Sequence, residues 1–392
     1  MTLRILSFTT LYPNAAQPTH GVFVENRLRR LVESGQAAVT MVSPVPWFPF
    51  KGDRFGRYST FAKVPREERR HGIDIYHPRF LTIPKLGMNM APTLMCRGVR
   101  AFMQKLVQEH GSFDVLDAHY FYPDGVAAAR LAKDLDLPVT VTARGTDLSL
   151  IPNFANPRQQ ITKAAETADA IITVCDALQR PLIELGIDPG KITTMRNGVD
   201  LDIFSPQERT TAREKWGVTG TTIVSVGRLD ENKGQHLTIE ALTKLPDVNF
   251  LIAGGGTEEA NLKALAQRLG VADRVHFLGM VPHEELASLY SAADISVLAS
   301  AREGWANVLL ESMACGTPVV ATDIWGTAEV VQEPAAGLLV KDRSAVVIAT
   351  SIRNILSNMP DRADTRAYAE KFSWDETTEA QLALFGQLAA HN

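Results

Sequence analysis

The sequence has few cysteines and no long apolar run. Its three cysteines, Cys96, Cys175 and Cys315, fit no metal-ligand spacing and are too few for a disulfide framework. A reducing cytoplasm is therefore the expected location. The N-terminus has no basic leader, so we expect no signal peptide. No stretch approaches the roughly 20 apolar residues that cross a bilayer.

Repeats, low-complexity segments and a dinucleotide fingerprint are also missing. The glycines at 254–256 complete no Gly-x-Gly-x-x-Gly, because Glu259 occupies the last place. This argues against a dinucleotide-dependent oxidoreductase. The 392 residues, 45% of them hydrophobic and 21% charged, have the balance of a globular chain long enough for two domains.

Basic residues gather in the first quarter of the chain. Residues 1–100 carry 15 Lys or Arg against 6 Asp or Glu, although the whole chain has a net charge of −4. Part of this excess is a mixed aromatic and basic run, consisting of Trp47, Phe48, Phe50, Lys51, Arg54, Phe55, Arg57, Tyr58 and Phe61. The run predicts peripheral contact with an anionic membrane, on its inner face. A disordered or core-capping loop is the alternative, and no nucleic-acid partner is expected.

Short β-branched runs alternate with helical stretches, which is typical of parallel α/β sheets. The first half predicts strands at 4–8, 39–42, 115–118, 139–142, 170–174 and 192–195. The second half predicts them at 222–226, 249–253, 274–278, 295–298, 318–321 and 337–340. We therefore expect two doubly wound domains, residues 1–200 and 201–372, facing a central cleft at the carboxyl ends of their strands. A terminal helix at about 373–392 should pack back on the first domain.

The strongest chemical pattern follows the predicted strand at 295–298. Glu303 and Gly304 lie in the loop after it, and Asn307 marks the start of a helix that carries Glu311 about one turn further on. Free backbone N–H groups at such a helix start can bind a phosphate. The alternative is a surface helix with two solvated glutamates.

A second pattern follows the predicted strand at 222–226. Gly227 ends the strand, and Arg228 and Lys233 place two cations five residues apart before the next helix. An arginine can fork onto phosphate oxygens, and a lysine adds a point charge. A solvated loop is the alternative, but finding both patterns in one α/β domain makes coincidence much less probable.

These segments resemble the Gly-Arg-Leu…Lys-Gly loop and the Glu-x₇-Glu motif of family 4 glycosyltransferases. The resemblance covers nearly the whole chain and includes Arg196–Asp200, Phe277–Val281 and Phe372–Trp374. It implies the GT-B fold and a retaining transfer of a sugar from a nucleotide-sugar donor to a glycan or lipid-linked acceptor. Residues 11–24 resemble the branch that builds cell-surface polysaccharides, including teichuronic acid.

The resemblance also implies roles for individual residues. Arg228 and Lys233 would hold the donor diphosphate, Glu303 the hydroxyls of the transferred sugar, and Glu311 the donor ribose. The catalytic set it implies is His119, Arg228, Lys233 and Glu303. The donor-binding set is Gly21, Gly227, Arg228, Lys233, Met280, Val281, Glu303, Gly304, Trp305, Ala306, Asn307, Val308 and Glu311.

The acceptor side departs from the family pattern. Family members often have His-Gly after the strand predicted at 139–142, whereas this chain has Arg144 and Gly145, followed by Asp147. Arg144 could bind an anionic acceptor or pair with Asp147. His119 would face the donor sugar, or it would be a satisfied polar group at a strand end.

No metal ligand set and no cofactor are expected. Asp200 and Asp202 have the Asp-x-Asp form of a metal site, but they lie in the predicted linker, where a turn is the favoured interpretation. The cations and the helix start would then stabilise the leaving diphosphate. A sugar-nucleotide epimerase of the same fold and a non-catalytic sugar-nucleotide-binding protein remain alternatives.

Overall fold

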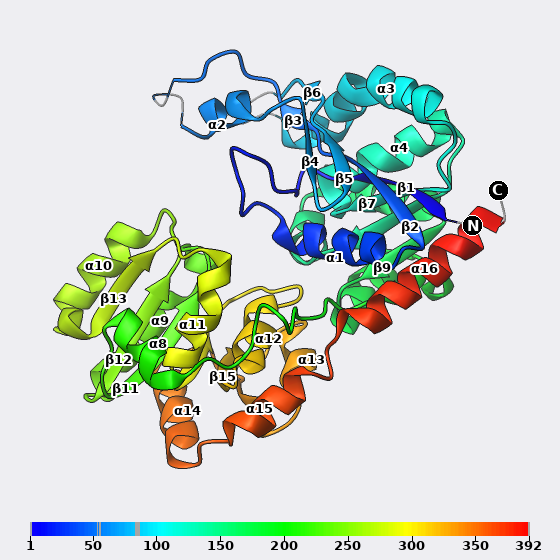
Figure 1. Cartoon of the computed structure of the whole chain (residues 1–392). Coiled ribbons are helices and arrows are strands. Elements are labelled where there is room, and N and C mark those ends of the chain that lie inside the picture. The colour runs from blue at the N-terminus through cyan, green and yellow to red at the C-terminus, as the bar shows by residue number, and fades with distance from the viewer. Residues whose placement is uncertain (1, 53, 55, 83–86, 391–392) are drawn as a thin grey trace. The chain divides into compact units, whose positions relative to one another are not determined.

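The computed structural model describes residues 2–52, 54, 56–82 and 87–390. The chain forms two compact units, one of residues 1–196 with 374–392 and the other of residues 197–373. Each is described by itself (Figure 1). Among the described residues, no helix combines the length and the apolar character that a membrane crossing requires.

The first unit is built on an eight-stranded sheet in the order β10-β9-β8-β7-β1-β2-β5-β4. All pairs are parallel except β4 with β5. The strands are β1 (Leu3–Phe8), β2 (Ala37–Val42), β4 (Glu67–Arg70), β5 (Ile73–Tyr76), β7 (Val115–His119), β8 (Val139–Ala143), β9 (Ala170–Thr173) and β10 (Ile192–Thr194). A separate pair joins β3 (Val45–Pro46) to β6 (Arg79–Phe80).

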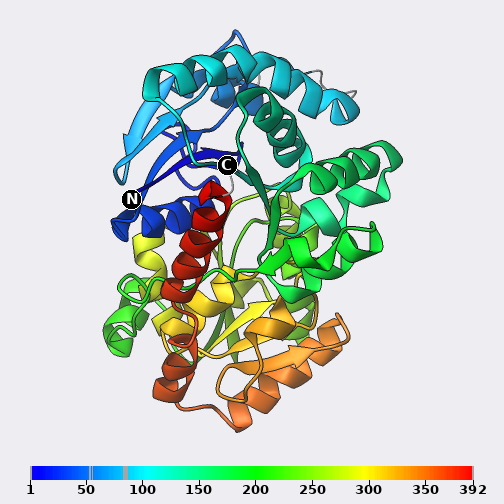
Figure 2. The ribbon, with the colours of Figure 1, turned by 90° about the vertical axis from the view of Figure 1, so that its right-hand side faces the viewer.

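The helices of this unit are α1 (Val22–Glu33), α2 (Arg57–Lys63), α3 (Ala91–His110), α4 (Val126–Leu135), α5 (Thr146–Ser149), α6 (Ala155–Thr167), α7 (Gln179–Glu184) and α16 (Trp374–Ala390). The C-terminal helix α16 lies beside α1 in both overall views (Figures 1 and 2). Its Leu382 and Phe385 are buried in the same apolar core as Leu28 and Leu31 of α1. Burial of such side chains contributes about 2 kcal/mol each.

The second unit contains a six-stranded, fully parallel sheet in the order β13-β12-β11-β14-β15-β16. Its strands are β11 (Thr221–Val226), β12 (Val248–Ala253), β13 (Val275–Gly279), β14 (Ile295–Leu298), β15 (Val319–Thr322) and β16 (Gly337–Val340). Its helices are α8 (Arg209–Trp216), α9 (Gln235–Ala241), α10 (Glu259–Arg268), α11 (Leu286–Ala292), α12 (Asn307–Ala314), α13 (Thr327–Val330), α14 (Ala345–Ser357) and α15 (Arg362–Ala369).

Both sheets have the doubly wound Rossmann-like order, in which the chain reverses direction beside the first strand. The reversal lies between β1 and β7 in the first unit and between β11 and β14 in the second. Ligands bind at the carboxyl ends of the strands at such a point. All twelve predicted strands are present, and the fold class is confirmed as two Rossmann-like α/β domains.

The prediction of six strands in the first half was incomplete. β5 is only four residues long, and the edge strand β4 consists of four charged residues that are exposed or half-buried. A strand at the edge of a sheet needs no apolar alternation, because solvent reaches its side chains. Hydrophobic patterning therefore could not detect it.

Candidate functional site

In the second unit, two predicted motifs meet where the sheet reverses direction. The loop after β11 carries Arg228 and Lys233, and the loop after β14 carries Glu303. The Lys233 Nζ lies 2.6 Å from Glu303 Oε1, and the two side chains are 23% and 12% exposed. Two residues 70 positions apart thus form a partly buried ion pair at this edge. The sequence predicted both residues here, but not their direct contact.

The second predicted cation has a carboxylate partner as well. The Nε of Arg228 lies 2.7 Å from Asp230 Oδ2, and the arginine side chain is 76% exposed. The other carboxylate oxygen of Asp230 accepts a hydrogen bond from the backbone N–H of Lys233 at 3.2 Å. Asp230 therefore fixes the turn between the two cations and neutralises one of them.

Glycines let two backbone segments, 227–229 and 254–256, approach each other closely beside these cations. A Cβ on Gly254 would lie 1.9 Å from the Gly227 carbonyl oxygen, and one on Gly256 would lie 2.1 Å from that of Leu229. Gly227 itself has a φ of +149°. Only glycine fits such contacts. Sequence analysis treated 254–256 solely as a failed fingerprint, although three consecutive glycines after a strand already indicate close backbone approach.

The end of β13 carries the residues expected to meet the base. A one-residue register shift follows Ile252, so that Ala253 pairs with Gly279. Met280 comes next, 64% exposed, and a Cβ on Gly255 would lie 3.5 Å from its sulfur. Val281 is half-buried. Met280 thus presents an open apolar surface over the glycine loop.

Helix α12 begins at Asn307, as predicted, and Ala306 is its N-cap. Trp305 is buried against the ring of Phe372, with 6.2 Å between centroids, so its indole serves packing. Gly304 and Val308 are half-buried. Asn307 accepts a hydrogen bond from the Asn197 side chain at 3.2 Å.

Glu311 lies in α12 and is half-buried. Its Oε2 accepts a hydrogen bond of 3.2 Å from the hydroxyl of the fully buried Tyr290, a residue that sequence analysis missed. Burial raises the pKa of Glu311 to about 7, and the Tyr290 hydrogen bond acts in the opposite direction. Both the ionised and the neutral form of this carboxyl group are therefore populated near pH 7.

The predicted residues of the first unit lie deep in its core. His119, at the end of β7, is fully buried. Its Nδ1 accepts a hydrogen bond of 2.8 Å from the Arg144 guanidinium, so its Nε2 carries the proton and faces Asp117 Oδ2 at 3.2 Å. Burial lowers the pKa of His119, Asp117 opposes this and Arg144 adds to it. His119 is therefore neutral, with Nδ1 hydrogen-bonded to Arg144 and Nε2 close to the Asp117 carboxylate.

The guanidinium group of Arg144 has partners within the core of the first unit. That group contacts His119 and lies 5.3 Å from the centroid of the Phe23 ring. The Asp147 carboxylate accepts backbone N–H bonds from Arg144, Gly145 and Phe121 at 2.7 to 3.1 Å. Asp147 thus holds the turn after β8 in place.

Two further buried ionisable side chains of the first unit, Arg27 and Asp124, were missed by sequence analysis. Arg27 of α1 is almost fully buried and donates to Gln381 Oε1 at 2.9 Å and to the Met195 carbonyl at 3.0 Å. Asp124 accepts hydrogen bonds from Thr9 and Thr10, just after β1. Burial raises the pKa of Asp124 to about 7. The buried carboxyl group of Asp124 therefore holds residues 9–10 in place.

Gly21 precedes α1 with a φ of +75°. A Cβ there would lie 2.3 Å from the Leu11 backbone. The loop after β1 thus folds tightly onto itself, and only glycine permits this. Whether it approaches a phosphate is a separate, functional prediction.

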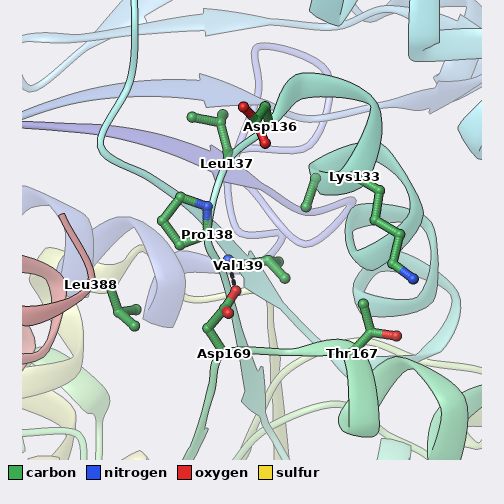
Figure 3. A pocket seen from close by; sticks show the side chains of 9 residues that line it. Lys133, Asp136, Leu137, Pro138, Val139, Thr167, Asp169 and Leu388 are labelled. Carbon is green, nitrogen blue, oxygen red and sulfur yellow. Dashed lines mark hydrogen bonds between the residues drawn. The ribbon is translucent and has the colours of Figure 1, made fainter. Parts of the chain in front are cut away.

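A pocket of about 340 Å³ lies in the first unit, at the end of the sheet opposite to the carboxyl ends of the parallel strands (Figure 3). Lys133, Asp136, Pro138 and Asp169 line it near the amino ends of β8 and β9, with Leu388 from α16. Asp169 accepts a hydrogen bond of 2.7 Å from the Val139 backbone. No predicted site residue lines it, and ligands of α/β folds bind at the other ends of the strands.

Two features named in the sequence can be placed briefly. The Asp200 carboxylate accepts backbone hydrogen bonds from Asp202 and Ile203, which confirms the turn interpretation. Across the described ranges, no group of three or more His, Cys, Asp or Glu side chains is arranged to hold a metal ion. Phe55 of the aromatic run lies outside the described residues.

Two family models match this chain. The model described as Glycosyl transferases group 1 matches residues 207–372, and the model described as Glycosyltransferase Family 4 matches residues 64–203. Together they span most of both units.

Solved structures share the fold. Sucrose-phosphate synthase from Thermosynechococcus elongatus superposes with a TM-score of 0.83 at 21% identity, covering 100% of both chains. The Anabaena protein HepE, solved in complex with UDP, gives 0.75 at 21% identity and covers 99% of this chain and 100% of that one. At these identities the likeness shows the GT-B fold.

Curated relatives are closer in sequence. A protein of Geodermatophilus obscurus named D-inositol 3-phosphate glycosyltransferase is 30% identical over 393 residues, covering 93% of this chain and 83% of that protein. A protein of the same name from Mycobacterium bovis is 32% identical over 321 residues, which cover 75% of this chain and 66% of the relative. With the fold, the paired motifs at β11 and β14 and this extended similarity, the chain belongs to the family 4 glycosyltransferases.

Proposed function

We propose that the protein transfers a sugar with retention of configuration from a nucleotide-sugar donor held by the second unit. The observation that carries this is the meeting of Arg228, Lys233 and Glu303 at the point where the sheet reverses direction, beside a glycine-lined turn. This arrangement offers cations to a diphosphate and a carboxylate to sugar hydroxyls. A neighbouring structure, that of HepE, was solved with UDP-glucose, which supports a donor of this class.

The chemistry follows from these groups. The bond between the anomeric carbon and the diphosphate oxygen breaks, and the leaving group takes the electron pair. Arg228 and Lys233 stabilise the negative charge that develops there. The acceptor oxygen attacks the same face of the sugar, and its proton passes to the leaving phosphate. Neither a nucleophilic carboxylate nor a metal ion is part of this proposal.

The roles of the remaining donor residues are proposed on the same basis. Glu311 binds the ribose hydroxyls, since its half-buried carboxyl group already accepts a hydrogen bond from one hydroxyl group, that of Tyr290. Met280 and Val281 meet the base. Gly21 brings the loop after β1 close to the phosphates.

His119 requires a more specific proposal. Because the ring is fully buried, with Nδ1 bonded to Arg144 and Nε2 3.2 Å from Asp117, it can reach the donor sugar only if these neighbours rearrange. We propose that Asp117 and Arg144 orient this ring, and that Asp147 shapes the acceptor-side turn through its backbone contacts.

The acceptor is proposed to be a glycan or a lipid-linked sugar of cell-surface polysaccharide synthesis. Support comes from residues 11–24 and from exposed apolar side chains in the first unit: Trp47, Phe50, Leu81, Met88 and Met90. The Trp47 backbone is hydrogen-bonded to Phe80, which places Trp47 next to Leu81. Lys51 and Arg54, which follow Phe50 in the sequence, are also exposed, and this combination suits the inner face of an anionic membrane.

Vesicle co-sedimentation tests the membrane contact. Anionic vesicles should retain the wild type better than neutral ones, and the double variant Trp47→Ala/Phe50→Ala should lose this retention. Ile183→Ala, which removes an exposed apolar side chain elsewhere in the same unit, is the matched control. Equal sedimentation with both vesicle types would count against the contact.

The decisive test of the proposed function begins with a thermal-shift panel of nucleotide sugars. Hits are then assayed for hydrolysis and for transfer to lipid-linked sugars and to inositol 3-phosphate. Interconversion of the sugar without an acceptor would indicate an epimerase. Binding without either reaction would indicate a non-catalytic binding protein.

A further inference from the structure

The ion pair of Lys233 and Glu303 joins two residues that the proposed function assigns to different parts of the donor. Lys233 is assigned to the diphosphate and Glu303 to the sugar, yet their charged atoms lie 2.6 Å apart. Arg228 is likewise paired with Asp230. Without ligand, both cations of the phosphate site thus have carboxylate partners. A diphosphate that reaches Lys233 therefore meets a carboxylate already bonded to it.

The two loops that carry the pair are tied together by their own hydrogen bonds. The Ala301 backbone N–H donates to the Asn232 carbonyl at 2.7 Å, and the Asn232 side chain donates to the Arg302 carbonyl at 3.1 Å. Arg343 donates to the Ala299 carbonyl at 2.7 Å and to that of Glu231 at 3.2 Å. The backbones are therefore fixed, and only the Lys233 and Glu303 side chains need to move.

We propose that Glu303 is a specificity-determining residue that competes with the diphosphate for Lys233 and so favours intact donor over bare nucleoside diphosphate. In the pair, the Glu303 side chain is only 12% exposed, and a charge left there without a partner carries a desolvation cost. Sugar hydroxyls of an intact donor provide new partners. A bare nucleoside diphosphate provides none, so it bears the full cost of breaking the pair.

The same competition assists product release. Once the sugar has left, Glu303 loses its hydroxyl partners while the product diphosphate still occupies Lys233. The carboxylate then returns to the ammonium group and displaces the product. Glu303 thereby links the presence of the sugar to the strength of phosphate binding.

This inference rests on the proposed donor site and is tested by calorimetric titration with UDP, GDP and ADP and with their glucose conjugates. In Glu303→Gln the neutral amide competes poorly for Lys233. We expect the matching bare diphosphate to bind roughly threefold to tenfold tighter than to wild type, the scale of a partly exposed ion pair. The intact donor should bind no tighter, so that its preference over the diphosphate falls.

Two controls isolate the contact. Glu231→Gln removes the same charge from the first loop but leaves the ion pair in place, and it should bind like wild type. In a Lys233→Ala background, Glu303→Gln should leave diphosphate affinity unchanged, because its effect acts through Lys233. Melting curves and a second variant, Glu303→Ala, guard against misfolding.

The outcomes separate the two proposals. If wild type binds none of these ligands, the proposed function fails and this inference fails with it. If wild type binds them but folded Glu303→Gln and Glu303→Ala bind the bare diphosphate no tighter, only the competition is overturned. If Glu303→Gln raised diphosphate affinity by the same factor in the Lys233→Ala background, the proposed competition would also be overturned.

Discussion

The two units place their predicted functional residues in opposite surroundings. In the second, Lys233 and Glu303 form a partly exposed pair on loops. In the first, Asp117 and His119 form a fully buried pair within β7, flanked by Arg27 and Arg144. Loop residues can exchange a partner for a ligand at modest cost, whereas buried ones cannot without leaving a polar group unsatisfied. The loop residues of the second unit can therefore exchange partners, whereas the polar core of the first unit holds its shape.

The largest expected effect is on the free energy of unfolding, and it compares the buried pair of the first unit with the loop pair of the second. Asp117→Ala leaves His119 and the nearby Arg27 without their buried carboxylate and should lower the free energy of unfolding by about 3–5 kcal/mol. Glu303→Ala breaks a partly exposed pair and should cost no more than about 1 kcal/mol. Urea unfolding of both variants measures the difference. Equal losses of unfolding free energy in the two variants would contradict this difference between the units.

The next effect is on turnover. Lys233→Ala should lower kcat by about 10²–10³, the scale for losing one electrostatic stabiliser of a leaving group. Its stability should change little, because the lysine is partly exposed. Steady-state kinetics at saturating donor measure kcat, and Lys263→Ala, which removes a helix-surface cation, is the control. A wild-type kcat in Lys233→Ala would remove this residue from the mechanism.

A smaller effect concerns Glu311 and pH. Its pKa is about 7 in the folded protein against 4.5 unfolded, so its contribution to stability is complete below pH 4.5 and is lost as pH rises through 7. The full shift corresponds to about 3 kcal/mol, and we expect about half because the side chain is partly exposed. Between pH 5 and pH 8, wild type should therefore lose more stability than Glu311→Gln. Parallel pH dependences would contradict this.

Sequence patterns predicted the central strands because each is short, apolar and buried on both faces. They failed at the sheet edge, where β4 is a run of four charged residues. The same limit applied to the sites. Loop motifs located Lys233 and Glu303, since their types and spacing are local. Their contact across 70 positions and the burial of His119 arise from tertiary packing, which no local pattern records.

The smallest expected effect is that of removing metal ions. Under the proposed mechanism, Arg228 and Lys233 supply the positive charge that stabilises the leaving diphosphate, and no divalent cation is needed. Donor turnover should therefore survive saturating EDTA. A loss of activity restored by Mn²⁺ would show that these cations are insufficient.

The central claim is that the loops after β11 and β14 hold the donor phosphates. It is tested most directly by titrating wild type, Lys233→Ala and His119→Ala with a nucleoside diphosphate and with the intact donor. The account predicts that Lys233→Ala binds both ligands more weakly, while His119→Ala binds the diphosphate nearly as well as wild type. If Lys233→Ala binds both ligands like wild type, or His119→Ala loses the diphosphate, the donor site is not in these loops.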